Sequence, residues 1–246
     1  MFFQQRAGAN ATLSYLLGCA GHGKAVAVDV VAGDEEWFLE QAARAGARLT
    51  HVVDTHVHAD HHSGGRELAR RAAAAYCLHE SNQGRAAFAF EPLADGRRLE
   101  AGNVLLDVIH TPGHSDDSVC LLVRDLRRGD MPWFMLTGDT LLVGGVGRPD
   151  LDGREREMAG RLYDSLHSRI LPLPAQLELY PGHQAGSACG AGLSGKPAST
   201  LGFEKRSNAL LSLAKAAFVH AITCESAPLP ADARRITAAN LGGVPS

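Results

Sequence analysis

With 246 residues, 45% of them hydrophobic and 21% charged, the chain has the composition of a globular protein and the length of one large domain, residues 1–246. Its net charge of −3 excludes the basic surface of a nucleic-acid-binding protein, and its short apolar stretches exclude a membrane-spanning helix. Five scattered cysteines without a CxxC pair, and an N-terminus without a signal-peptide pattern, predict a cytoplasmic protein with no disulfide framework.

The first half of the chain alternates predicted strands with predicted helices. Apolar runs bounded by turn residues predict strands over residues 11–17, 25–31, 49–54 and 75–78. Helical periodicity predicts one helix that starts after Asp34 and ends near Gly46, and a second over residues 63–73. The third of these strands ends directly before a polar segment that is rich in histidine.

The second half of the chain places several strands in succession before the helices return. Strands are predicted over residues 104–110, 118–124, 133–137 and 177–180. Helices are predicted over residues 155–167, 201–219 and 231–241. The Gly- and Ser-rich residues 186–200 are expected to form an ordered loop. This order favours an α+β fold in which two mixed sheets pack face to face between helices, an αββα sandwich.

The polar segment carries four potential metal ligands within six residues, His56, His58, Asp60 and His61. In a loop, alternating side chains can turn toward one point, and imidazole with carboxylate suits zinc, iron or manganese. A solvated turn would explain a lone HxH pair, but the added Asp-His and the Ser-Gly-Gly that follows favour a metal-binding loop. His62 is expected to face away from the metal.

Three further candidates share one arrangement, in which a strand is followed by glycine and then by a metal-competent side chain. They are His114, Asp139 and His183. A single histidine of this kind would more often be a hydrogen-bonded core residue, but three repeats favour a shared centre that glycine lets the backbone approach closely. Asp29, at the end of the strand over residues 25–31, is interpreted as a strand-end cap rather than a brace for the metal-binding loop.

The order THxHxDH, TPGH, GD and GH resembles the metallo-β-lactamase superfamily over nearly the whole chain. The resemblance implies an αββα fold with a metal site at one edge of the sandwich. Flavodiiron members carry Glu at the position of His58, and the main class of zinc β-lactamases carries Cys at the position of Asp139. Nuclease branches add domains and a basic groove that have no counterpart here.

The segments that follow two of the candidates resemble persulfide dioxygenases, particularly the type often fused to rhodanese domains. Residues 144–151 read GGVGRPDL, and residues 184–190 read QAGSACG. Glyoxalase II is the alternative relative, but no counterpart of its C-terminal helical domain is evident. Relatives of this type continue into rhodanese domains, so the resemblance leaves two alternatives, a stand-alone member or a chain whose partner is a separate rhodanese sulfurtransferase. A homo-oligomer is expected on general grounds.

The resemblance implies one Fe(II) per chain, held by His56, His114 and Asp139, with open positions for a persulfide substrate and O₂. The remaining candidates would line a second position and orient the ligands of the iron; these are His58, Asp60, His61 and His183. The same seven residues can instead hold two metals, such as zinc, in a hydrolase.

Two residues near the candidate ligands are predicted to act on the substrate. The guanidinium of Arg148 would suit a carboxylate or the oxygens of sulfite, and an exposed loop arginine is the alternative. Cys189 would receive or relay a persulfide if the pKa of its thiol were lowered, and a buried structural cysteine is the alternative.

The favoured function is therefore a dioxygenase that oxidises a thiol persulfide, such as glutathione persulfide, with O₂ to sulfite and thiol. The alternative is a glyoxalase II-like thioester hydrolase, in which a metal-bound hydroxide attacks a carbonyl. A third interpretation is a non-catalytic, persulfide-sensing protein, which the intact set of seven ligands disfavours.

Overall fold

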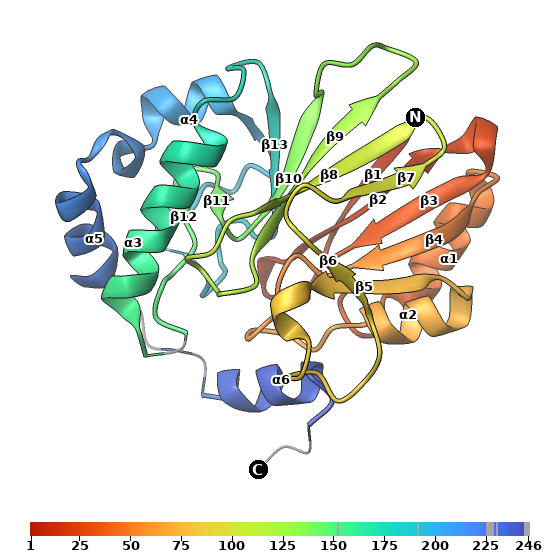
Figure 1. Ribbon diagram of the computed structural model, residues 1–246, viewed down its shortest axis with the longest axis horizontal. Coiled ribbons are helices and arrows are strands. Elements are labelled where there is room, and N and C mark those ends of the chain that lie inside the picture. Colours follow the sequence, from red (N-terminus) through yellow and green to blue (C-terminus); the bar gives the residue numbers. More distant parts are fainter. Residues whose placement is uncertain (152, 191, 225–228, 230, 244–246) are drawn as a thin grey trace.

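Two six-stranded sheets pack face to face at the centre of the computed structural model (Figure 1). The structure describes residues 1–151, 153–190, 192–224, 229 and 231–243. Helices cover both outer faces, so the predicted αββα sandwich is confirmed. None of the helices among these described residues is long and apolar enough to cross a membrane.

The first sheet is mixed and follows the chain order. Its strands are β1 (Phe2–Ala7), β2 (Leu13–Cys19), β3 (Lys24–Val28), β4 (Arg48–Val53), β5 (Ala75–His79) and β6 (Glu91–Leu93). Strands β1 to β3 are antiparallel, and β3 to β6 are parallel. Parallel neighbours need crossover connections, which α1 (Glu35–Arg44) and α2 (Gly65–Ala72) provide on the outer face. The edge strand β1 was not predicted.

The second sheet is also mixed, and a small hairpin accompanies it. In spatial order its strands are β14 (Ser199–Thr200), β13 (Glu178–Pro181), β10 (Phe134–Gly138), β9 (Val119–Asp125), β8 (Val104–His110) and β7 (Arg98–Ala101). Only β10 and β13 run parallel. The hairpin consists of β11 (Leu141–Leu142) and β12 (Gly145–Val146). Helices α3 (Glu155–Ser165), α4 (Leu201–Ser207) and α5 (Lys215–Cys224) cover the outer face.

The core of the molecule has one apolar layer between the sheets and one under each set of helices. Along β2, Leu13, Tyr15 and Leu17 point between the sheets, while Leu16 points toward the helices. This is the period of two expected for a strand. Burial of each such side chain contributes about 1.5–3 kcal/mol to folding, which makes the sandwich a rigid support for the loops at its edge.

Two predicted elements differ from the structure. The helix over residues 201–219 is wrong: the extended backbone of Asn208 separates α4 from a 3₁₀ turn, and α5 begins only at Lys215. The Asn208 side chain accepts from the Leu210 N–H and donates to the Gly145 carbonyl, which stabilises the break. The strand that begins near Ala25 ends at Val28 rather than residue 31, because Asp29 has a left-handed φ of 54°.

The last described helix, α6 (Ala233–Asn240), lies apart from both helical layers, below the edge at which the loops after β4 and β8 meet (Figure 1). The candidate functional site lies at this edge.

Candidate metal centre and adjoining pocket

The metal-binding loop, residues 55–61, follows β4 and is held in shape by the buried carboxylate of Asp29. Asp29 accepts hydrogen bonds from the Thr55 backbone N–H at 2.7 Å and from the Thr55 hydroxyl at 3.0 Å. Its Oδ1 also lies 3.2 Å from Nε2 of His58. The interpretation of Asp29 as a plain strand-end cap is therefore wrong, because its carboxylate braces the loop that carries the histidines.

Asn240, the last residue of α6, fixes the backbone of the same loop from outside. Its Nδ2 donates to the carbonyl oxygens of His58 and His61, both at 2.9 Å. Its Oδ1 accepts from the Ser63 N–H, also at 2.9 Å. Sequence reasoning missed Asn240, because partners 177 to 182 positions away leave no local pattern.

The structure brings together His56, His114 and Asp139, none of which is more than 2% exposed. One ligand atom from each lies within 4.8 Å of the others. The rings of His56 and His114 are almost perpendicular, with centroids 4.8 Å apart, and Nε2 of His114 lies 3.5 Å from Asp139 Oδ2. The three residues follow β4, β8 and β10, so both sheets supply this set.

Glycines permit the close packing of the turns that carry these side chains. Gly138 has a φ of 48°, and a Cβ there would lie 2.7 Å from the Thr55 hydroxyl oxygen. Gly113 has a φ of 149°, and a Cβ there would lie 2.3 Å from the Cα of Leu162. A larger residue at either position would push a ligand-bearing turn away from its neighbour.

A second set of candidates, His58, Asp60 and His61, also has ligand atoms within 4.8 Å of one another. The rings of His58 and His61 have centroids 4.2 Å apart, and Nδ1 of His61 lies 3.1 Å from Asp60 Oδ2. His62 is exposed, as its predicted outward orientation requires. The loop thus directs its histidines toward two adjacent positions, one shared with His114 and one beside Asp60.

His183 connects the two sets through their carboxylates. Its Nδ1 lies 2.8 and 3.0 Å from the two oxygens of Asp139, and its Nε2 lies 2.9 Å from Asp60 Oδ2. The sulfur of Cys189 forms a further set of ligand atoms within 4.8 Å with Asp60 and His183. Cys189 is only 5% exposed, so it is buried beside the second set.

His56 of the first set and His58 of the second set differ in protonation. Burial lowers the pKa of His56 well below its ordinary value, and the imidazoles of His58 and His114 lower it further. Burial also opposes the charged form of His58, but the hydrogen bond and charge of Asp29 outweigh it and raise its pKa to about 9. In the metal-free protein at pH 7, His56 is therefore neutral, whereas His58 holds a proton.

The carboxylates are ionised because a charged imidazole lies between them. Burial raises the pKa of Asp60 and of Asp139, but the contact with His183 outweighs it and holds both well below their usual range. Burial likewise opposes the charge on His183. The charge of Asp139 outweighs this effect and raises the pKa of His183 well above its ordinary value. Burial raises the pKa of the Cys189 thiol to about 11, so the lowered pKa needed for a persulfide relay is absent in the metal-free protein.

Arg148 is buried, at 6% exposure, so the alternative of an exposed loop arginine is wrong. Its guanidinium binds Asp150 through two nitrogens at 2.6 and 2.7 Å and donates to the Ala188 carbonyl at 2.9 Å. Its own carbonyl lies 2.9 Å from Nδ1 of His114 and so orients that ring. Arg148 thus joins the loops that carry His114 and Cys189, while its contact with a substrate stays a prediction.

Four ligand atoms of the two sets are buried without a hydrogen-bond partner among the described residues. They are His56 Nε2, His58 Nδ1, His61 Nε2 and Asp60 Oδ1. Each unpaired buried polar atom costs about 1–3 kcal/mol, and a bound cation would remove that cost. Imidazole and carboxylate donors suit zinc, iron and manganese, so the residues fit a metal centre.

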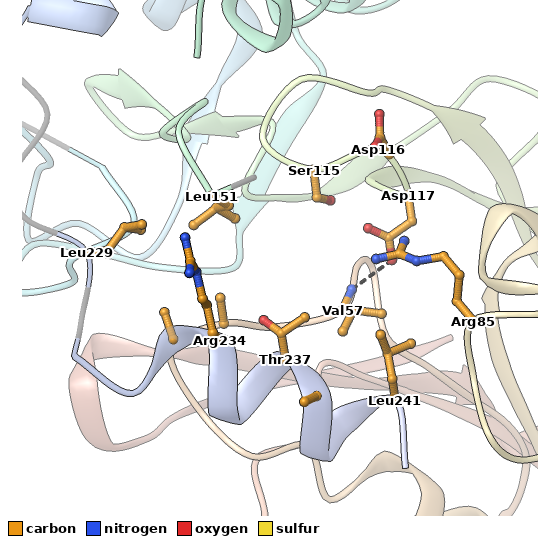
Figure 2. Close-up of a pocket in the computed structure, with 13 residues that line it drawn as sticks. Val57, Arg85, Ser115, Asp116, Asp117, Leu151, Leu229, Arg234, Thr237 and Leu241 are labelled. Atoms are coloured by element: carbon orange, nitrogen blue, oxygen red, sulfur yellow. Dashed lines mark hydrogen bonds between the residues drawn. The ribbon is translucent and has the colours of Figure 1, made fainter. Parts of the chain in front are cut away.

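A pocket of about 470 Å³ borders the metal-binding loop (Figure 2). Its walls include Val57 and Ala59, which alternate with the ligand candidates of the loop, and Ser115, which follows His114. Helix α6 supplies a further wall. Pockets of roughly 300–1,000 Å³ commonly hold small molecules, so this one is large enough for a substrate beside the metal candidates.

Comparison with known proteins places this geometry in a family. Residues 7–187 match the model of the metallo-beta-lactamase superfamily. The chain is 30% identical over 219 residues to the mitochondrial persulfide dioxygenase ETHE1 of Bos taurus, covering 89% of this chain and 79% of that protein. It is also 30% identical over 187 residues to a hydroxyacylglutathione hydrolase of Nitrosococcus oceani, covering 75% of this chain and 67% of that protein.

A solved structure extends the likeness to three dimensions. The crystal structure of ETHE1 from Myxococcus xanthus superposes with a TM-score of 0.82 at 30% identity, over 98% of this chain and 100% of that chain. The two activities named among these relatives, persulfide dioxygenase and hydroxyacylglutathione hydrolase, belong to proteins that are equally identical to this chain, at 30%.

Proposed function

The chain belongs to the metallo-beta-lactamase superfamily, and on this basis we propose that it is a persulfide dioxygenase with one Fe(II) per chain. It would convert a thiol persulfide, O₂ and water into thiol, sulfite and two protons, with the four electrons lost by the terminal sulfur reducing O₂. The observation that carries the proposal is the buried set of His56, His114 and Asp139. Two histidines and one carboxylate form the ligand set of non-haem Fe(II) oxygenases, which leaves coordination positions open.

The extent of the likeness also supports the dioxygenase. The chain matches the whole length of the Myxococcus xanthus ETHE1 structure and 79% of the bovine enzyme, against 67% of the hydrolase. Glutathione persulfide is the proposed substrate for testing, because the hydrolase among the relatives acts on a glutathione conjugate by its name.

In this proposal, the residues of the chain would bind the iron, orient its ligands and shield the site from water. Fe(II) bound by His56, His114 and Asp139 would supply the one-electron chemistry that O₂ requires. The Arg148 carbonyl accepts from Nδ1 of His114 and so directs Nε2 of that ring toward Asp139. The charged His183 ring keeps Asp139 ionised, and the adjacent pocket receives the thiol part of the substrate. The sandwich and its loops together exclude water from the side chains of His56, His114, Asp139 and His183, which are 1–2% exposed.

The first test combines metal analysis with an oxygen electrode. Protein purified anaerobically and supplied with glutathione persulfide should contain about one iron per chain and consume O₂ only when the persulfide is present. Sulfite should accumulate in an amount equal to that of the O₂ consumed. Substitution of His114 by alanine should abolish both iron binding and oxygen uptake, whereas His62→Ala, at the exposed position directly after the metal-binding loop, should retain them.

A glyoxalase II-like hydrolase is the second candidate, and one specific observation favours it. The second set contributes three further unpaired ligand atoms, on His58, Asp60 and His61, so the site has donors for two metals. Two metals per chain, no oxygen uptake and turnover of a glutathione thioester would replace the dioxygenase by this function. A rhodanese sulfurtransferase partner and a homo-oligomer stay predictions.

A further inference from the structure

Two hydrogen bonds join the metal-binding loop to the chain at the start of β9. The Val119 N–H donates to the Thr55 carbonyl, and the Val57 N–H donates to Oδ2 of Asp117, both at 2.8 Å. Thr55 and Val57 are the chain neighbours of His56, so the two bonds hold the backbone on both sides of this ligand. We propose that Asp117 is a positioning residue, which sets the place of His56 relative to the other ligands of the metal centre. This inference rests on the metal centre of the proposed function, which the hydrolase alternative shares.

The two bonds have the spacing of an antiparallel ladder in which a side chain replaces one backbone group. In such a ladder, the carbonyl of one residue and the N–H of the residue two positions later both bond to the opposite strand. Here the second acceptor is the carboxylate of Asp117 in place of its backbone carbonyl. Strands β4 and β9 belong to different sheets, so the backbones of the two sheets meet here beside the metal centre. A substitution can therefore remove one of these bonds without altering the backbone.

The carboxylate of Asp117 is buried and is held in one orientation. Asp117 is 2% exposed, and the same Oδ2 accepts from Nδ2 of Asn82 at 2.8 Å. Asn82 is fully buried, and its Oδ1 accepts from the guanidinium of Arg85 at 3.2 Å, so its amide nitrogen faces Asp117. Figure 2 shows the Asp117 carboxylate directed at the backbone nitrogen of Val57. Asn82 thus orients the carboxylate toward one backbone N–H of the metal-binding loop.

Asp117 belongs to the turn that carries His114, residues 111–118, and this turn is closed on itself. The Ser115 N–H donates to the Ser118 hydroxyl at 3.2 Å, and the two serine hydroxyls lie 2.6 Å apart. The carboxylate therefore links a loop of the first sheet to a turn of the second sheet, each of which carries a ligand. Metal sites tolerate changes in ligand distance of only a few tenths of an ångström, so loosening this link should weaken metal binding.

The test measures binding of Co²⁺ to the metal-free full chain through the visible absorption bands of the bound ion. Asp117→Ala leaves the Val57 N–H without its acceptor. We expect the dissociation constant of the first Co²⁺ bound to rise at least about tenfold, the usual effect of losing a group that orients a metal ligand. Asp117→Asn keeps a side-chain oxygen for both donors and should stay within about threefold of the unchanged protein. The bands of bound Co²⁺ should change in Asp117→Ala and not in Asp117→Asn.

Asp125 provides a matched control, because it is also a buried aspartate that accepts from a backbone N–H. It is 3% exposed, lies at the opposite end of β9, and accepts from the Arg127 N–H at 3.2 Å. Asp125→Ala should lower the melting temperature of the metal-free chain and leave the Co²⁺ dissociation constant unchanged. Three results would overturn the proposal: no loss of affinity in Asp117→Ala, an equal loss in Asp125→Ala, or an equal loss in Asp117→Asn.

Hydrogen exchange examines the same contact in the unchanged protein, so the answer does not depend on whether Asp117→Ala folds. In the metal-free chain, the Val57 amide should exchange at least about a hundredfold more slowly than in an unstructured peptide, because it is buried and bonded to Asp117. Asp117→Asn should retain this protection. Exchange of the Val57 amide at the rate of an unstructured peptide would show that the carboxylate does not hold the loop.

The outcome is separable from that of the proposed function. Persulfide-dependent oxygen uptake, together with full Co²⁺ affinity in Asp117→Ala, would sustain the dioxygenase and contradict the positioning role. Thioester hydrolysis without oxygen uptake, together with weakened Co²⁺ binding in Asp117→Ala alone, would sustain the positioning role and replace the dioxygenase.

Discussion

Single residues decide how readily each of the two sets of candidate ligands takes a metal. In the first set, burial keeps His56 neutral, and His183 keeps Asp139 ionised, so both residues already have the form that binds a cation. In the second set, the hydrogen bond to Asp29 holds a proton on His58. A metal at the second position must displace that proton, which favours occupancy of the first position near neutral pH.

This difference predicts two binding steps with different pH dependence. In calorimetric titrations of the metal-free protein with Zn²⁺, the weaker step should strengthen about tenfold per pH unit from pH 7 to 9 and level off above the His58 pKa of about 9. The affinity of this step rises with pH because His58 holds a proton in the metal-free protein and must lose it when the metal binds. His58→Asn should remove this slope and leave the stronger step intact. Equal slopes for both steps would contradict the assignment.

The burial of Cys189 predicts an unreactive thiol. Its pKa of about 11 means that, in the metal-free protein, the thiolate fraction at pH 8 is on the order of one in a thousand. Iodoacetamide at pH 8 should therefore label the exposed Cys224 and leave Cys189 unlabelled, and labelling of Cys189 should increase as the pH rises toward 11. Mass spectrometry of tryptic peptides measures both sites in one sample. Rapid labelling of Cys189 at pH 8 would revive the persulfide relay.

At the scale of elements, α6 has two tasks at the same edge of the sandwich. One part of its surface lines the pocket, through Arg234 and Thr237, and its last residue holds the metal-binding loop. Asn240 bonds to backbone groups of the loop, so its contacts do not depend on which side chains the loop carries. The pocket wall and the ligand loop are thereby parts of one connected structure.

Substitution of Asn240 by alanine should loosen the loop without removing a ligand. Three hydrogen bonds are lost, so we expect the free energy of unfolding to fall by about 2 kcal/mol. The dissociation rate of the metal should rise, which stopped-flow mixing with a chelator measures. Arg235→Ala, on an exposed face of the same helix, is the control and should change neither quantity. A metal dissociation rate equal to that of the unchanged protein would show that Asn240 does not position the loop.

The elements that sequence patterns predicted are those with local signals. Strand β8, Val104–His110, was predicted with its exact bounds because apolar residues and turn residues delimit it. The candidate ligands were readable because each follows a strand within a short motif. By contrast, β1 is a half-buried edge strand with a weak alternation, and the break at Asn208 depends on its contact with Gly145. The bracing contacts of Asp29 and Asn240 form only when distant segments meet, so no window of sequence contains them.

At the scale of the whole molecule, the candidate centre joins the two sheets. His56 follows a strand of the first sheet, whereas His114 and Asp139 follow strands of the second. A metal bound by all three would link the two halves of the sandwich at one edge. Since the unfolded chain has no such site, binding would add to the free energy of unfolding.

Removal of the metal should therefore lower the thermal stability of the entire chain. A ligand present at about 1,000 times its dissociation constant adds about 4 kcal/mol, and for a chain of this length each kcal/mol shifts the melting temperature by about 2–4 °C. We expect chelation to lower the melting temperature by roughly 10 °C in calorimetry under anaerobic conditions. Asp139→Ala should melt at the same temperature with and without chelator, because it removes the carboxylate ligand, whereas the exposed His62→Ala should keep the full shift. If chelation left the melting temperature of the unchanged protein the same, the metal would not connect the sheets.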